Sequence, residues 1–244
     1  MQSTSSTVSS DEIRDEMRAS KPLSRVIDWL TAAVLVFGGM LFAALGTSLY
    51  SLADHERIAS WVADGTLTST ELTDAELIDT TQALLTWGGI GMAVTGLLLA
   101  VSGVAFLVYR NRVRQASVET AAPDSVTLAI VGAVVTIVTS FVPLSPTLGG
   151  AVAGYLRGGD ANSGARIGAY AGLVASLPFA LLGLFLLGGL VVVASELGLG
   201  GLGVFVALAM VFSILVSVVY LVGLSALGGY LGVRLAARER APSA

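Results

Sequence analysis

The chain has 244 residues, of which 55% are hydrophobic and 12% are charged, and its mean hydropathy is +0.84. Soluble domains carry about a quarter charged residues because a surface in water must be hydrated, so this composition predicts a lipid environment. The chain has no cysteine and one histidine, His55, which excludes disulfides, thiolate or histidine-cluster metal sites, and Cys- or His-based catalytic triads.

The charged residues are unusual in kind. Lys21 is the only lysine beside twelve arginines, seventeen residues are acidic, and the formal net charge is −4. Carboxylates hold a hydration shell where high salt screens the net charge over a few ångströms. This balance is typical of proteins from extreme halophiles, and we expect such a source.

Residues 1–25 form a polar tail. Ser9 and Glu12 have the spacing of a capping box, which predicts a short helix over 10–19. The apolar run after the tail is too long for the hydrophobic region of a signal peptide. We therefore expect the tail to stay attached, as a cytoplasmic arm.

Four apolar stretches are each long enough to cross a bilayer. A helix needs about 20 residues to span about 30 Å of hydrocarbon, and none of the four stretches has a charged residue at its centre. Barrel strands are excluded because they are about ten residues long and alternate in polarity. The predicted spans are 26–53, 82–109, 165–194 and 203–235.

Basic residues indicate the orientation. They cluster before the first span, after the second and after the last, which places both termini in the cytoplasm by the positive-inside rule. This topology explains the arginines without a nucleic acid partner. The loop at 54–81 carries seven acidic residues and one arginine, as expected for the outer side.

A fifth apolar segment, 126–157, is interrupted by the sequence PLSP at 143–146. It begins after Arg114 and ends at Arg157, and both arginines prefer the cytoplasm, so the chain is expected to turn back within it. A first arm of about 26 Å and a second of about 15 Å fit this segment at 1.5 Å per residue. The fold class is therefore all-α and polytopic, with four full spans plus a re-entrant or asymmetric helical hairpin; two full crossings are the alternative.

The outer loop is expected to be structured. Ile58, Trp61 and Val62 share a helix face that ends near Gly65, and a capping box formed with Glu76 predicts that the second span starts near Asp74. Solvation of an exposed halophilic loop explains its acids better than a divalent cation does, because the spacing of a calcium loop is absent. The acids considered are Asp54, Glu56, Asp74, Glu76 and Asp79.

Glycines at four-residue spacing mark the region after the PLSP sequence. Such residues share a helix face and let two backbones pack closely in lipid, so tight packing is favoured over a pore or substrate passage. We expect the two stripes to face each other as an antiparallel pair. The stripes are Gly150, Gly154 and Gly158, and then Gly164, Gly168 and Gly172. Similar stripes on the last span are Ala209, Ser213 and Ser217, and then Gly228, Gly232 and Ala236.

Pro143, Ser145 and Pro146 are the other candidate site. Transporters hold substrates or ions at broken helices, and several hydroxyl groups lie near this turn in the sequence. Ser and Thr also join helices in lipid, which is the favoured reading. The predicted hydrocarbon depth holds no carboxylate pair, metal cluster or basic residue, so we expect no catalytic residue, no bound metal, no cofactor and no enzymatic activity.

The sequence GAVVT at 132–136, PLSPTLGGAVAGYL at 143–156 and GARIG at 164–168 resemble a domain of unknown function in haloarchaeal membrane proteins, over about 126–235. Residues 26–114 are similar to other uncharacterised membrane proteins of haloarchaea. The resemblance implies a cell-membrane location and a halophilic archaeal source, and it implies no activity and no functional residues.

These observations predict a two-helix unit over 26–114, a linker over 115–125, a glycine-rich unit over 126–236 and a cytoplasmic tail over 237–244. The expected function is a structural or assembly role through glycine-mediated packing. The expected partner is the bilayer, and self-association into a homo-oligomer is a further hypothesis. The alternative is a channel or facilitator for a small solute that uses the turn at 143–146; its ligand stays unidentified.

Overall fold

The computed structural model describes residues 10–116 and 125–239, and it describes side chains over 25–112 and 125–239. Within these ranges every element is an α-helix. The helices are α1 (Ser10–Ser51), α2 (His55–Ala63), α3 (Asp74–Ala116), α4 (Ser125–Val138), α5 (Ser145–Arg157), α6 (Ala161–Glu196) and α7 (Gly200–Glu239). Segments of α1, α3, α6 and α7 are long and apolar enough to cross a membrane, which confirms the predicted multi-pass helical class.

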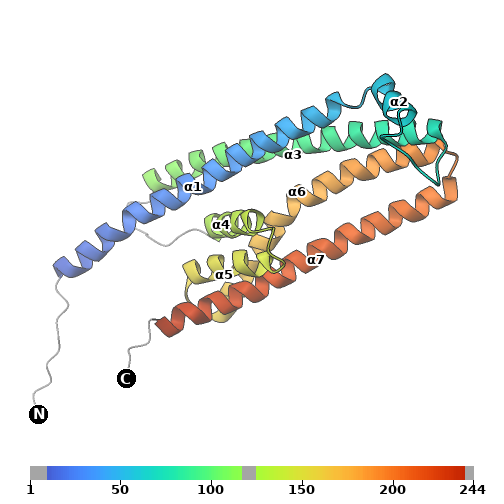
Figure 1. Cartoon of the computed structure of the whole chain (residues 1–244). Helices are drawn as coiled ribbons and strands as arrows, with labels where there is room; N and C mark the ends of the chain where they lie inside the picture. The colour runs from blue at the N-terminus through green and yellow to red at the C-terminus, as the bar shows by residue number, and fades with distance from the viewer. Residues whose placement is uncertain (1–9, 117–124, 240–244) are drawn as a thin grey trace, which may run out of the picture.

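The helices form two antiparallel pairs with a hairpin at one end. α1 lies along α3, and α6 lies along α7 (Figure 1). The α4–α5 hairpin packs at the end of the molecule where α1 begins and α7 ends, while α2 lies at the opposite end (Figure 1). A chain with four crossings and a hairpin that returns to its starting side has this arrangement.

The polar helix predicted over 10–19 is continuous with the first span. α1 runs without interruption from Ser10 to Ser51, through Pro22. Ser9, the predicted cap, lies outside the described residues. The expected boundary between tail and span at residue 25 is therefore not a break in the helix.

The outer loop is ordered by two helix caps. The Asp54 carboxylate accepts a hydrogen bond from the Arg57 backbone N–H at 3.0 Å, and Ile58 is fully buried on the inner face of α2. The backbone N–H of Thr73 donates to the Glu76 carboxylate at 2.8 Å, while the Glu76 N–H reaches the Thr73 hydroxyl at 3.4 Å. The predicted start of the second span is confirmed. Two of the acids considered as cation ligands, Asp54 and Glu76, serve instead as caps.

The α4–α5 hairpin differs from the predicted one in the position of its turn. α4 has 14 residues and α5 has 13, so the arms are about 21 and about 20 Å long at 1.5 Å per residue. The turn covers 139–144, whereas Ser145 and Pro146 belong to the first turn of α5, where the fixed φ of proline suits a helix start. The arms are therefore nearly equal, and each is shorter than the roughly 30 Å hydrocarbon core.

The two predicted units, 26–114 and 126–236, meet mainly through α3 and α6. Trp87 packs on Gly188 and Gly189, and Phe185 packs on Gly91, so aromatic rings fill the space that missing side chains leave. Pro178 lies inside α6, and Figure 1 shows α6 changing its direction along its length. Proline removes one helical hydrogen bond and clashes with the preceding turn, so a bend is expected there. One part of α6 consequently follows α3 while the other packs against α4 and α5.

Single-cysteine labelling tests this arrangement, and the chain has no native cysteine to interfere. We expect a membrane-impermeant maleimide to label Asp160→Cys and Glu239→Cys from one side of the membrane. Asp64→Cys and Ser195→Cys should be labelled from the other side. If Asp160→Cys is labelled from the same side as Asp64→Cys, the α4–α5 hairpin crosses the membrane and the arrangement is wrong.

Candidate functional site

The glycines of α5 and α6 converge on one stretch of α7. A Cβ atom added at Gly150 or Gly168 would clash with the backbone of Ser225, and one added at Gly154 or Gly164 would clash with the backbone of Gly229. Gly172 likewise faces α7, since its Cβ would lie 2.7 Å from the Leu221 carbonyl oxygen. The two stripes therefore do not face each other as predicted. Both face a third helix that their spacing alone does not identify.

The second small-residue stripe of α7 completes this contact. Cβ atoms at Gly228 and Gly232 would meet the carbonyl oxygens of Thr147 and Ala151 on α5. Ser225, at the point where α5, α6 and α7 converge, is fully buried. Its hydroxyl finds no hydrogen-bond partner among the described residues. The three helices are thus held at a distance set by backbone atoms.

Gly158 has a different role from the rest of its predicted stripe. Its φ angle is 62°, in the left-handed region that favours glycine, and its N–H donates to the Gly154 carbonyl at 3.1 Å. Gly159 follows with a φ of 85°. These two glycines end α5 and reverse the chain into α6, so Gly158 is a turn residue.

The turn at 139–144 is apolar and exposed. Phe141 is 83% exposed and Leu144 is 58% exposed, as expected for side chains that contact lipid. The hydroxyl of Thr136 donates to the Gly132 carbonyl at 3.0 Å, and that of Thr139 donates to the Val135 carbonyl at 2.7 Å. Both hydroxyls are satisfied by backbone carbonyls of α4. Ser145 is buried at 7% exposure, between Pro143 and Pro146 in the sequence.

A second glycine contact, between α1 and α3, was missed from the sequence. Gly39 faces Gly96 and Gly46 faces Gly89, each pair reciprocally, so that an added Cβ on either partner would clash with backbone of the other helix. The glycines at this contact are seven residues apart in each helix. On α3 the same spacing continues from Gly96 to Gly103. A seven-residue repeat keeps one face toward an antiparallel neighbour, but a search for four-residue spacing does not detect it.

A buried ion pair also joins α1 to α3. Arg110 Nε lies 2.9 Å from Asp28 Oδ2, and the two side chains are 14% and 5% exposed. The sequence places both residues near the ends of their spans without indicating that they meet. Each charge neutralises the other, so this end of the two-helix unit can lie at the edge of the hydrocarbon region.

An apolar cavity lies between the two units. Its volume is about 700 Å³, and residues of α3, α4 and α6 supply most of its wall. Neither this cavity nor the two smaller pockets found beside 160–166 and at 28–29 and 107–111 is lined by Pro143, Ser145 or Pro146. The polar side chains at its wall are Thr95, Ser102, Ser125 and Tyr170.

Replacing Gly154 with alanine tests the contact with α7. The added Cβ would lie within 3 Å of the Gly229 backbone, which cannot move without shifting α7. We expect Gly154→Ala to destabilise the protein by about 1–3 kcal/mol, measured by unfolding in detergent with denaturant.

Gly223→Ala on α7 is the matched control. An added Cβ there has no atom within 4 Å, so alanine should leave stability unchanged or raise it by up to about 1 kcal/mol through its better helix propensity. Equal effects of the two substitutions would contradict the proposed role of the Gly154 contact.

The Asp28–Arg110 pair gives a second stability prediction. Asp28→Asn leaves a guanidinium group uncompensated, and because Arg110 is only partly buried we expect a loss of about 3 kcal/mol, the lower end for a broken buried pair. The double variant Asp28→Leu/Arg110→Met removes both charges and should cost much less. If the double variant has a lower melting temperature in detergent than Asp28→Asn, the pair is not the stabilising element.

The glycine-rich unit is also the part of the chain that matches a known family. Residues 126–235 match the model of a family described as a family of unknown function (DUF5518). The chain matches no curated protein and no solved structure. The match covers α5, α6 and almost all of α4 and α7, and the description of the family contains no activity.

Proposed function

We propose that the chain is a structural membrane protein that acts without catalysis and assembles with further copies of itself through α7. The observation that carries this proposal is that one small-residue stripe of the chain is exposed, whereas the others contact other helices. Those of α5 and α6, and the second stripe of α7, all contact other helices of the same chain. The first stripe of α7, formed by Ala209, Ser213 and Ser217, is exposed.

The exposed stripe has the properties of a helix–helix contact in lipid. Lipid tails are as apolar as leucine, so burial of large apolar side chains does not drive association, and small residues that permit close packing are favoured. The Ser217 hydroxyl donates to the Ser213 carbonyl at 2.8 Å, so this hydroxyl is satisfied within α7. Large side chains, including Leu208, Leu215 and Val219, occupy a different face of the same helix.

Symmetry restricts how two copies can meet. The ends of α1 and α7 that carry the termini lie at the same end of the molecule (Figure 1). Copies inserted in the same orientation are related by a two-fold axis along the membrane normal, so their α7 helices run parallel. A residue close to this axis contacts the same residue of the other copy.

Disulfide crosslinking in native membranes tests the assembly. We expect Ser213→Cys to form a crosslinked dimer under mild oxidation, because Ser213 lies in the exposed stripe. Leu215→Cys is the control: it is also exposed and at a similar depth, but it projects from a different side of α7. A monomer for both variants, or equal crosslinking of both, would contradict assembly through this stripe.

The solute facilitator stays an alternative prediction. The apolar wall of the cavity and the internally bonded hydroxyls of Thr136 and Thr139 do not support it. In proteoliposomes we expect the purified protein to leave the permeability to glycerol, urea and small ions at the level of empty vesicles. A permeability that rises with protein and falls in Ser145→Leu would favour the facilitator.

A further inference from the structure

The cavity between the two units has the length of one membrane leaflet. Along α6 its lining extends from Tyr170 to Leu181, which is about 16 Å at 1.5 Å per residue, and along α4 it extends from Ser125 to Ile137, about 18 Å. One leaflet of a hydrocarbon core of about 30 Å is about 15 Å thick. With Ser125 and Tyr170 at the membrane surface, a cavity of the length measured along α6 would reach roughly the middle of the bilayer.

The wall of this cavity fits a hydrocarbon chain. Thirteen of its eighteen lining residues are leucine, isoleucine, valine or alanine. Pro178 lines it near the deep end of the α6 wall, where the bend of the helix draws α6 away from a straight course. A volume of about 700 Å³ lies in the range of small-molecule sites.

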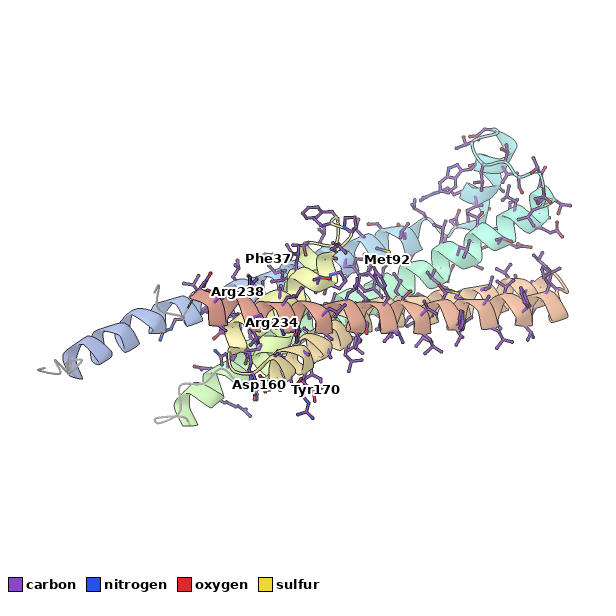
Figure 2. All side chains as sticks on the ribbon, turned by 90° about the horizontal axis from the view of Figure 1, so that it is seen from below. Phe37, Met92, Asp160, Tyr170, Arg234 and Arg238 are labelled. Atoms are coloured by element: carbon purple, nitrogen blue, oxygen red, sulfur yellow. The ribbon has the colours of Figure 1, made fainter. Side chains whose placement is uncertain are left out.

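Two arginines lie near the end of the cavity that Ser125 and Tyr170 form. Arg157 Nη1 donates to the Ser125 hydroxyl at 2.8 Å, and Ser125 lines the cavity. Arg166 lies four residues before Tyr170, so the two share a face of α6. Both arginines are exposed. Figure 2 shows Tyr170 at the same end of the molecule as Asp160.

Acidic residues also occur at this end. Asp160 shares a small pocket with Arg166, and hydrogen bonding from the Ser163 side chain lowers the pKa of Asp160, so its carboxyl is ionised at neutral pH. Asp124 precedes Ser125 in the sequence. The two guanidinium groups must outweigh these carboxylates for the site to select an anion, and guanidinium suits a phosphate because it binds two oxygens at once.

We propose that the cavity binds one chain of an anionic phospholipid from the surrounding bilayer, with its phosphate held by Arg157 and Arg166. The chain fills the space between α3, α4 and α6, and the head group stays at the membrane surface. The lipid thereby joins the two units where their helices do not touch. This site is separate from the exposed stripe of α7.

Native mass spectrometry of the detergent-purified protein tests the proposal. We expect one phosphatidylglycerol to bind at least about tenfold more tightly than phosphatidylcholine, a difference of about 1.4 kcal/mol. Arg157→Gln/Arg166→Gln should abolish this preference. The control Arg234→Gln removes an arginine that stacks on Tyr230 of α7, with its Cζ 4.5 Å from the ring centroid, and should preserve the preference.

The result that would overturn the proposal is equal binding of the two lipids, or equal loss in the double variant and in Arg234→Gln. Val174→Trp, which fills the cavity from α6, should reduce binding of the chain, and a thermal melt should show that each variant is folded. Unchanged lipid binding in a folded Val174→Trp protein would place the lipid elsewhere.

Two further experiments distinguish a lipid chain from other occupants of the cavity. One is the substitution of Thr95, and the other is competition with a head group that has no chains. Thr95 lines the cavity, is 2% exposed, and its hydroxyl has no hydrogen-bond partner among the described residues. A hydrocarbon chain offers no acceptor, so Thr95→Val should bind the lipid as well or better. Loss of binding in Thr95→Val would identify a ligand with a polar group inside the cavity. Glycerol phosphate should not displace the lipid, and displacement by it would contradict a chain-binding site.

Discussion

The close approach of helix backbones at glycine is the constraint on which the rest of this structure depends. Burial from water does not drive the association of helices in lipid. Van der Waals contacts and weak interhelical hydrogen bonds hold the helices together instead. Gly150 and Gly154 bring α5 against Ser225 and Gly229 of α7, and Gly39 and Gly46 bring α1 against α3 in the same way. A single methyl group at most of these positions would meet backbone atoms, which cannot rotate away.

This constraint makes α7 the central helix of the glycine-rich unit. Its second half, from Leu221 onward, receives the glycines of α5 and α6, while most residues from Leu202 to Tyr220 are exposed. Each arm of the α4–α5 hairpin is too short to span the hydrocarbon core alone. α5 packs to backbone distance against α7, and the exposed face of the first half of α7 is left for lipid or for another copy.

The two units pack against each other through large aromatic side chains rather than through backbone contacts. Trp87 and Phe185 fill the space opposite glycines where α3 and α6 touch, whereas near Pro178 and along α4 the units stand apart and enclose the apolar cavity. In water such a cavity would be costly, but a bilayer supplies chains that match its length and polarity. The arginines that positive-inside topology explains can therefore have a second role at the mouth of that cavity.

Features that depend on residues close together in the chain can be predicted from the sequence alone. Span lengths, the cap at Thr73 and Glu76 and the apolar face around Ile58 follow from local spacing and from the span-length rule. The hairpin near 143–146 follows from the arginines on either side of its segment. The tertiary structure decided which helix each glycine stripe contacts, that Asp28 meets Arg110, and that a cavity remains between the units. The physical reason is that four-residue spacing shows which residues share a helix face, but in a uniformly apolar chain nothing local shows which other helix that face will meet.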